Sequence, residues 1–331
     1  SSCMLMGGYS NGANQEQLNA LETFGEKLGL CFQIKDDIFD YYSDDIVGKP
    51  TGSDLKEGKV SLPLLYAISS NSDSRNANMR NLLTKQSLSD EEISILVDYA
   101  KERGVGIVLW GGYWAVNRDM ENLFKHYAEM GVKGFKIDFM DRDDQDMVNF
   151  YERAAATAAK YKLMVDFHGA YKPCGLSRKY PNVVNYEGVN GLEQMKWSGL
   201  ELDQVTYDVQ IPFIRMVAGP MDYTQGAMRN AQKSSYRASN SEPMSQGTRC
   251  RQLAMYVIFE APFNMLCDSP SNYEKEKECT EFIAEIPTVW DQTVALDGKI
   301  GEFAVMARRA GEEWYVGGLT NWSQREIEVN L

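Results

Sequence analysis

The sequence has no run of about 18 apolar residues, the length that a membrane-spanning helix needs, so no membrane insertion is predicted. Basic residues are scarce relative to acidic ones, because 34 Lys and Arg stand against 47 Asp and Glu, for a formal net charge of −13. Binding to phosphate backbones needs clustered cations. Nucleic acid is therefore excluded as a predicted partner.

Two further signals are missing. None of the six cysteines stands in a Cys-x-x-Cys pair, which argues against a zinc site or a disulfide framework and predicts free thiols. The first residues, Ser-Ser-Cys-Met-Leu-Met-Gly-Gly, have neither the charged region nor the long apolar region of a secretory signal. The sequence as given therefore predicts a cytoplasmic location.

The N-terminal part carries a helical pattern with an acidic end. Apolar residues recur at three- and four-residue steps from Leu18 to Ile38 and predict one helix over residues 14–42. Near its end, Asp36, Asp37 and Asp40 share one helical face. Magnesium bound to a diphosphate would relieve the repulsion between these carboxylates. A solvated acidic face is the alternative, and the spacing leaves both open.

A glycine-rich loop with two lysines, Lys49 and Lys59, follows these aspartates. Together with Phe32 and Gln33, the aspartates and this loop resemble the C-terminal part of the trans-isoprenyl diphosphate synthases. The resemblance implies that the three aspartates bind Mg²⁺ and that the two lysines contact the diphosphate. That family also uses an earlier Asp-Asp-x-x-Asp motif, and none precedes residue 36. Residues 1–93 are therefore predicted to be an all-α, polyprenyl-synthase-like remnant that does not act as a prenyltransferase.

The pattern changes after a helix that begins at Ser89, where Ser89 and Glu92 form a capping box and Gly104 ends the helix. Strands and helices then alternate, which is typical of a (β/α) barrel. The predicted strands are Val105–Trp110, Gly134–Asp138, Leu163–Phe167, Val183–Tyr186, Ile211–Val217 and Met265–Cys267, and the predicted helices are Asn117–Met130, Asp143–Lys160 and Gln246–Phe259.

About six strands, where a (β/α)8 barrel needs eight, predict an incomplete barrel over residues 94–286. From Thr288 to Leu331 the sequence alternates, as in Trp314–Leu319 and Glu326–Val329, and predicts antiparallel strands. Residues 287–331 are therefore expected to be the start of a C-terminal β-sheet domain. The fold class is mixed: an all-α segment, an incomplete (β/α)8 barrel of the TIM type, and antiparallel β structure.

Acidic residues stand just after successive predicted strands, at Asp138, Glu187 and Asp222 for example. Aromatic residues, among them Trp110 and Tyr113, are interleaved with them. A single strand-end aspartate is commonly a cap or a turn residue, but a series in register favours a site. Aromatic faces and carboxylates in one cleft suit a carbohydrate. Glycoside cleavage needs two carboxyl groups.

These residues resemble glycoside hydrolase family 97. The resemblance rests on Leu-Trp-Gly-Gly-Tyr-Trp-Ala-Val at 109–116, Lys-Ile-Asp-Phe-Met-Asp at 136–141, Val-Asp-Phe-His-Gly-Ala-Tyr-Lys-Pro at 165–173, Asn-Tyr-Glu-Gly-Val-Asn-Gly-Leu-Glu at 185–193 and Ala-Gly-Pro-Met-Asp-Tyr-Thr at 218–224. The family holds α-glucosidases and α-galactosidases, some inverting and some retaining. Its members carry an N-terminal β-sandwich and two barrel strands ahead of the segment that matches here from Val105.

The resemblance implies specific roles. Asp138 matches the nucleophile of retaining members, and Glu193 matches the general acid/base. Gly169 stands where inverting members carry a base glutamate, which implies retention. Glu187 and Glu193 match ligands of the family's calcium ion. The predicted substrate contacts are Trp110, Tyr113, His168, Lys172 and Asp222, although a structural hydrogen bond at the strand end is an alternative for His168.

The sequence therefore predicts a retaining α-glycosidase that acts on an α-linked oligosaccharide or a galactoside. Two alternatives stay open: a prenyltransferase-like segment that binds diphosphate and Mg²⁺, and a catalytically inactive chimera or fragment. The resemblance to a family that is often periplasmic differs from the cytoplasmic location that the sequence as given predicts. The oligomeric state is left open.

Overall fold

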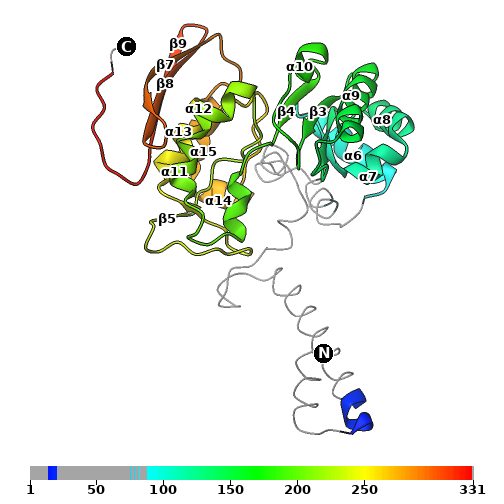
Figure 1. Cartoon of the computed structure of the whole chain (residues 1–331). Coiled ribbons are helices and arrows are strands. Elements are labelled where there is room, and N and C mark those ends of the chain that lie inside the picture. Colours follow the sequence, from blue (N-terminus) through cyan, green and yellow to red (C-terminus); the bar gives the residue numbers. More distant parts are fainter. Residues whose placement is uncertain (1–13, 21–74, 76–77, 79–81, 83–87, 330–331) are drawn as a thin grey trace. The chain divides into compact units, whose positions relative to one another are not determined.

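The structure is a computed structural model that describes residues 14–20, 75, 78, 82 and 88–329 (Figure 1). Of the helix predicted for residues 14–42, the described part is helical over residues 15–20, where Leu18 N–H donates to the Asn14 carbonyl at 2.9 Å. The rest of the predicted all-α segment lies outside the described residues. Within the described residues, no helix is long and apolar enough to cross a membrane.

Four short parallel strands form the sheet that carries the predicted site. They are β1 (Val108–Gly112), β2 (Gly134–Asp138), β3 (Met164–Phe167) and β4 (Val183–Tyr186), and they pair in that order. The strand predictions for this part are confirmed, although β1 begins and ends later in the chain than the predicted Val105–Trp110. The inner strands β2 and β3 are buried over nearly their whole length, as parallel strands are when helices cover them.

One helix precedes these strands and others connect them, and they pack on the sheet (Figure 1). They are α6 (Asp90–Lys101), α7 (Tyr113–Arg118), α8 (Met120–Glu129), α9 (Gln145–Lys160) and α10 (Leu176–Lys179). The predicted capping box at Ser89 is confirmed, since its side chain accepts from Glu92 N–H while the Glu92 carboxylate accepts from Ser89 N–H. The predicted helix Asn117–Met130 is instead two helices, α7 and α8.

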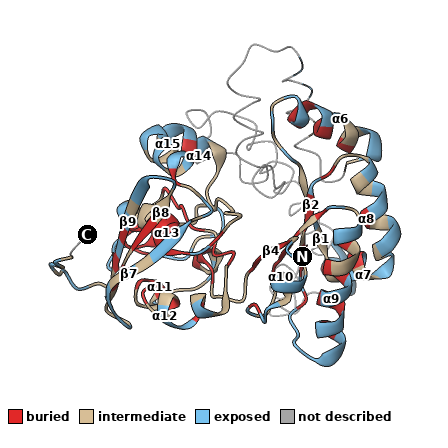
Figure 2. Cartoon of the chain, turned by 90° about the horizontal axis from the view of Figure 1, so that it is seen from above, coloured by how far each residue is buried: buried red, intermediate tan, exposed pale blue. Residues whose placement is uncertain are grey.

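Apolar side chains from these helices and strands form one core. Phe124 of α8, Phe135 of β2, Phe150 of α9 and Phe167 of β3 are all at most 3% exposed. Figure 2 shows buried residues on the strands and exposed residues on the outer sides of α8 and α9. This core fixes the four strands, and so fixes the side chains at their carboxyl ends.

Beyond β4 no further regular strand pairs with the described sheet, but isolated hydrogen bonds attach later segments of the chain. Asp222 N–H donates to the Tyr186 carbonyl at 2.8 Å, and Met221 N–H donates to the Glu260 carbonyl at 2.9 Å. The Asn185 amide donates to the Phe263 carbonyl at 2.9 Å. These bonds place Asp222 beside the end of β4.

Two strand predictions in this part are wrong. Ile211–Val217 forms α12 (Ile211–Ile214) followed by the 3-10 helix η3 (Met216–Ala218). Pro212 explains the error, because proline removes a ladder donor and is favoured in the first turn of a helix. Met265–Cys267 forms no strand.

Further short elements complete this part of the chain. They are η2 (Leu192–Lys196), α11 (Gln204–Asp208), β5 (Asn230–Ala231), β6 (Ser245–Gln246), α13 (Arg249–Ile258), α14 (Pro270–Lys275) and α15 (Lys277–Glu285). The predicted helix Gln246–Phe259 corresponds to α13.

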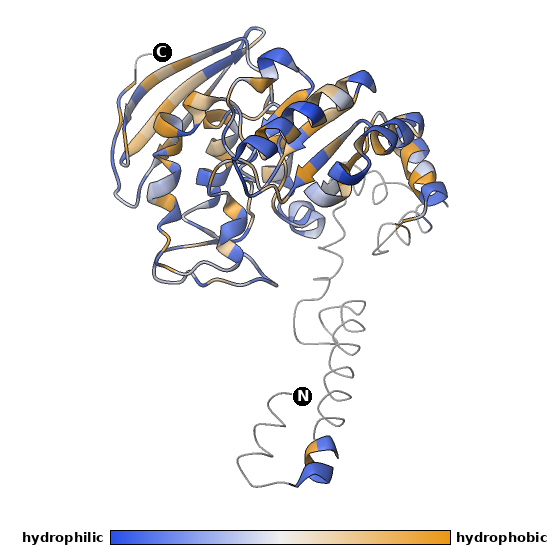
Figure 3. Cartoon of the chain, turned by 45° about the vertical axis from the view of Figure 1, so that its right-hand side comes forward, coloured by the Kyte–Doolittle hydropathy of each residue, from blue (hydrophilic) through white to orange (hydrophobic). Residues whose placement is uncertain are grey.

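The C-terminal antiparallel sheet is present as predicted. It consists of β7 (Gln292–Lys299), β8 (Phe303–Ala310) and β9 (Glu313–Thr320) in that order, and Figure 3 shows apolar residues along these strands. Helix α13 packs against β9. The predicted strand Glu326–Val329 is wrong, because these residues are irregular. The described residues thus form a parallel β/α part followed by a C-terminal antiparallel sheet.

Candidate active site

Strand register brings three predicted site residues to one edge. Gly112 pairs with Asp138 across β1 and β2, and Phe167 pairs with both Ile137 and Tyr186. His168 follows Phe167 and Glu187 follows Tyr186, so Asp138, His168 and Glu187 all stand at the carboxyl ends of neighbouring strands. This is the edge where parallel β/α folds place their chemistry.

Asp138 is held as a carboxylate. Its Oδ2 accepts a hydrogen bond from Trp110 Nε1 at 3.0 Å, and its Oδ1 accepts from Phe139 N–H at 2.7 Å. The Asp138 Oδ1 also lies 3.6 Å from Nδ1 of His168. Burial raises the pKa of Asp138, but His168 and these hydrogen bonds outweigh it and lower the pKa to about 2. Asp138 is therefore ionised at neutral pH, as a nucleophile must be.

His168 lies among three carboxylates. Besides Asp138 at Nδ1, its Nε2 lies 3.5 Å from Oε1 of Glu187 and 3.6 Å from Oδ2 of Asp222. Burial and the charge of Lys136 lower the pKa of His168, yet Asp138, Asp222 and Glu187 raise it by more, so the net shift is upward. The cationic imidazolium is favoured and links the strand ends electrostatically.

A second layer of polar side chains, which was not predicted from the sequence, lies two residues before Asp138 and His168 on β2 and β3. Lys136 Nζ lies 2.6 Å from Oδ2 of Asp222 and 3.9 Å from Oδ2 of Asp166. Burial and the charge of Asp222 raise the pKa of Asp166 well above its usual value. The signal was present in the sequence, because Lys136 and Asp166 stand two residues before Asp138 and His168 and so share their faces of the strands.

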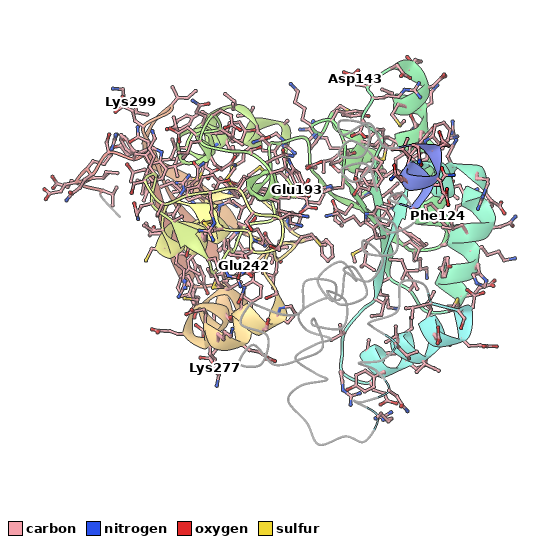
Figure 4. The ribbon with its side chains drawn as sticks, turned by 90° about the horizontal axis from the view of Figure 1, so that it is seen from below. Phe124, Asp143, Glu193, Glu242, Lys277 and Lys299 are labelled. Atoms are coloured by element: carbon pink, nitrogen blue, oxygen red, sulfur yellow. The ribbon has the colours of Figure 1, made fainter. Side chains whose placement is uncertain are left out.

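Glu187 and Glu193 form the candidate metal site. Together with His168 they each offer one ligand atom, and these atoms lie within 4.8 Å of one another. Glu193, labelled in Figure 4, lies in the 3-10 helix η2. A hydrogen bond from Leu192 N–H to the Tyr223 carbonyl at 3.0 Å holds this helix in place.

The residues at this site fit a cation. Glu187 Oε2 accepts from Gly169 N–H at 2.7 Å. Burial, and further the negative charges of Glu193 and Asp222, raise the pKa of Glu187 to about 7 against the opposing effect of His168. A bound cation would stabilise the ionised form of Glu187, and carboxylate oxygens are the ligands that calcium prefers.

The remaining predicted substrate contacts lie in different surroundings. Trp110 is 40% exposed, and Lys172 is exposed. The Tyr113 ring packs edge-on against Phe150 with ring centroids 4.7 Å apart, so much of it belongs to the core. Asp222 is 2% exposed and binds Lys136, which places it beneath His168.

Gly169 has a steric role at this site. Its φ is +56°, and a Cβ there would stand 2.8 Å from Phe139 N and 3.0 Å from Oδ1 of Asp138. Real Cβ atoms essentially never approach other atoms to under 3.0 Å. A larger residue at 169 would therefore displace the Asp138 carboxylate.

The other predicted site is not part of the described structure. Asp36, Asp37 and Asp40, predicted to bind Mg²⁺, and Lys49 and Lys59, predicted to contact diphosphate, all lie outside the described residues.

Comparison with known proteins reveals two relationships along the chain. Residues 62–189 match the model of Glycoside hydrolase 97, and residues 289–331 match Glycosyl-hydrolase 97 C-terminal, oligomerisation. Residues 1–100 match Polyprenyl synthetase. The two resemblances predicted from the motifs are thus confirmed.

Individual relatives divide in the same way. A retaining alpha-galactosidase of Bacteroides thetaiotaomicron is 67% identical over 245 residues, which are 74% of this chain and 37% of that protein. A short chain isoprenyl diphosphate synthase of Methanocaldococcus jannaschii is 33% identical over 89 residues, which are 27% of each protein. The chain therefore spans little more than a third of the length of the curated galactosidase that it matches.

A solved structure supports the first relationship. It is a glycoside hydrolase family 97 enzyme from a Pseudoalteromonas species in complex with acarbose. This enzyme superimposes on the present chain with a TM-score of 0.62 at 28% sequence identity. The match covers 73% of this chain and 40% of that one.

Proposed function

We propose that residues 94–331 are the catalytic part of a retaining α-glycosidase, with an α-galactoside as the preferred substrate. Asp138 acts as the nucleophile and Glu193 as the general acid/base. The preference for galactose rests on the relative named a retaining alpha-galactosidase, which is identical to this chain at two residues in three over the matched region.

The pairing of Asp138 with Gly169 is the observation that carries this proposal. Asp138 is ionised at the end of β2, and Gly169 packs so closely against it that a side chain at residue 169 would displace its carboxylate. A base that activates water for inversion needs room for that water, whereas a nucleophile must reach the anomeric carbon directly. An ionised Asp138 supports direct attack, and with it retention.

The reaction has two steps. An Asp138 oxygen attacks the anomeric carbon while Glu193 gives its proton to the departing glycosidic oxygen, so that a glycosyl ester forms and the aglycone leaves as an alcohol. Water then attacks the same carbon, Glu193 takes a proton from it, and the ester bond to Asp138 breaks. Two inversions give net retention of configuration.

Several side chains prepare Asp138 for this attack. The hydrogen bonds from Trp110 and Phe139 N–H hold the carboxylate in one orientation. His168, whose pKa is raised, lies 3.6 Å from Asp138 Oδ1, and its protonated form stabilises the negative charge of the carboxylate before attack and after release of the sugar. Preorganisation of this kind lowers the barrier, because no dipoles need to reorient during the reaction.

Glu187 and Glu193 would hold a calcium ion in this proposal. When bound, the cation supplies positive charge that binds sugar hydroxyls and tunes the acidity of nearby groups. The raised pKa of Glu187 supports this assignment, since burial and the neighbouring carboxylates outweigh the opposing effects of His168 and the Gly169 N–H.

We also propose that the parallel sheet belongs to the incomplete (β/α)8 barrel that the sequence predicts. The bonds that continue from Tyr186 to Asp222 and from Met221 to Glu260 are those expected between successive barrel strands.

Azide rescue tests the assignment of Asp138. Asp138→Ala is expected to lose at least about 10³-fold in kcat on an aryl α-galactoside, because no covalent intermediate can form. Added azide should restore turnover and yield the β-galactosyl azide, detected by NMR. Rescue that gives an α-azide, or an Asp138→Ala variant that keeps wild-type activity, would refute the proposal.

The segment that resembles polyprenyl synthetases supports a second candidate function, the binding of an isoprenyl diphosphate with Mg²⁺. Calorimetric titration with an isoprenyl diphosphate, with and without Mg²⁺, tests it. Binding that needs Mg²⁺ and is lost in Asp36→Ala supports the candidate, and absence of binding with Mg²⁺ present rejects it.

A further inference from the structure

Arg215 is a buried cation that the proposed reaction does not use. It directly follows α12 and is 5% exposed. Among the described residues, no carboxylate lies within ion-pairing distance of its guanidinium. Burial lowers the pKa of Arg215 to about 10, so the side chain remains charged at neutral pH. A buried charge is costly unless something compensates it, so its partners need an explanation.

Those partners are five backbone carbonyl oxygens. Nε donates to Gly188 at 2.9 Å, and Nη1 donates to Gly219 at 3.0 Å. Nη2 donates to Glu187 at 2.9 Å, Pro220 at 3.0 Å and Tyr186 at 3.2 Å. The partial negative charges of the converging carbonyls replace the counter-ion, and the planar guanidinium spans them with donors in fixed directions.

The five carbonyls come from two segments that end in site residues. Residues 186–188 carry Glu187, and residues 219–220 lead directly into Asp222. The Tyr186 carbonyl accepts from both Arg215 and Asp222 N–H, so one oxygen joins the two segments and the arginine. Arg215 thus spans the backbones behind two of the three carboxylates that surround His168.

The local backbone is shaped for this contact. Gly188 has a φ of +44° and Gly219 a φ of +126°, both in the left-handed range that favours glycine. A Cβ on Gly188 would stand 2.5 Å from Lys172 N. Two glycines are therefore placed where the chain turns its carbonyls inward toward one cation.

We propose that Arg215 is a positioning residue that sets the placement of the Glu187 and Asp222 carboxylates around His168. This role deepens the proposed glycosidase function and rests on it for its catalytic consequence. Arg215 touches no substrate and acts through the backbone of the residues that it holds.

Two substitutions test the role. Arg215→Lys keeps the charge but has one nitrogen with three donors, so it cannot hold all five carbonyls. Arg308→Lys is the matched control, because Arg308 is fully buried and bonds the Ile258 carbonyl at 3.0 Å and Glu260 Oε2 at 3.1 Å. Both variants lose buried hydrogen bonds, but only the first lies behind the site.

The chain contains only two histidines, which gives a readout that needs no activity. His168 lies in the site, whereas His126 is exposed and its Nε2 lies 3.0 Å from Oδ2 of Asp90. In histidine-labelled protein, Arg215→Lys is expected to shift the imidazole C–H resonance of His168 and to leave that of His126 in place. Arg308→Lys is expected to shift neither, although both variants lower the melting temperature.

Kinetics supply the second readout. Arg215→Lys is expected to lower kcat for an α-galactoside by about 10- to 100-fold, the range for residues that orient groups around a site, with a smaller change in KM. Arg308→Lys should keep the wild-type kcat. The proposal is overturned if Arg215→Lys lowers the melting temperature as Arg308→Lys does, yet leaves kcat and the His168 resonance unchanged.

Failure of the two proposals can be told apart. If the wild-type protein hydrolyses no α-galactoside, the proposed function fails, while the His168 resonance still decides the role of Arg215. If Arg215→Lys does not fold, Gly219→Ala replaces it, since a β-carbon at a φ of +126° moves one of the held carbonyls. A shifted His168 resonance in Gly219→Ala supports the proposal, and an unchanged one overturns it.

Discussion

At the scale of single residues, the site depends on one missing side chain as much as on its charged groups. Gly169 lets the Asp138 carboxylate occupy the end of β2, with Oδ1 only 3.0 Å from where a Cβ would stand. The same residue donates its N–H to Glu187, so it joins the candidate nucleophile to the candidate metal ligand.

Gly169→Glu should therefore abolish activity by displacing Asp138, with a loss in kcat of at least about 10²-fold because misplacement of a reacting group by 1 Å costs that much. Gly175→Glu is the matched control, since Gly175 also has a left-handed φ, +93°, but nothing lies within 4 Å of its Cβ position. Steady-state rates on an aryl α-galactoside compare the two. Equal losses in both variants would contradict the steric account.

The raised pKa of Glu187 predicts how stability depends on pH in calcium-free buffer. The folded pKa of about 7 lies above the usual 4.5, so the folded protein retains a proton that the unfolded chain releases between these values. The contribution of Glu187 is fully present below pH 4.5 and is lost as pH rises to 7, by about 3 kcal/mol.

Glu187→Gln isolates this contribution, because glutamine does not titrate. Chemical unfolding of both proteins at several pH values with a chelator present measures it. The stability of the wild type relative to the variant should fall between pH 4.5 and 7. A relative stability that stays constant or rises over that range would contradict the assignment of the raised pKa to Glu187.

At the scale of helices and strands, the sequence predicted an element correctly where its local pattern of residues was clear. Alternating residues at Gly134–Asp138 predicted β2, and the regular succession of strands and helices predicted β4 at Val183–Tyr186, both with their observed bounds. The capping box at Ser89 predicted the start of α6. These features depend on neighbours in sequence, which a sequence pattern contains.

The errors occur where tertiary contacts or proline override the pattern. Ile211–Val217 has the apolar and β-branched residues of a strand, but Pro212 begins a helical turn there, and the following Arg215 is held by carbonyls from distant segments. The strand period puts Lys136 and Asp166 on the same strand faces as Asp138 and His168, but their contact with Asp222 joins residues that lie 86 positions apart, from Lys136 to Asp222. No local pattern predicts that encounter.

The packing of α13 on β9 gives a prediction at this scale. A Cβ on Gly317 would stand 2.9 Å from Val257 Cβ and 3.0 Å from Ile258 Cγ1, so Gly317→Ala should destabilise the protein by about 1–3 kcal/mol through overpacking. The neighbouring Gly318 is exposed, and its Cβ position lies 3.9 Å from Val305 Cγ2. Gly318→Ala should therefore change the unfolding free energy by less than about 0.5 kcal/mol. Equal effects in a denaturant titration would contradict this packing.

At the scale of the whole molecule, the chain joins segments that resemble two unrelated enzyme families. The sequence predicted both resemblances because each rests on compact motifs. The described structure adds the arrangement of the glycosidase-like site, which draws residues from five segments of the chain. Asp138, Glu187 and Asp222 lie around the His168 imidazole, and Trp110 donates a hydrogen bond to Asp138. A functional site of this kind supports activity only if the chain folds around it as a unit.

Covalent trapping tests that central claim most directly. The full chain is incubated with calcium and an activated fluorogalactoside whose glycosyl ester hydrolyses slowly, and its peptides are then sequenced by mass spectrometry. The account predicts one hexosyl adduct per chain, located on Asp138, and no adduct in Asp138→Asn. An adduct on another residue, or none with either galactose or glucose reagents, would contradict it.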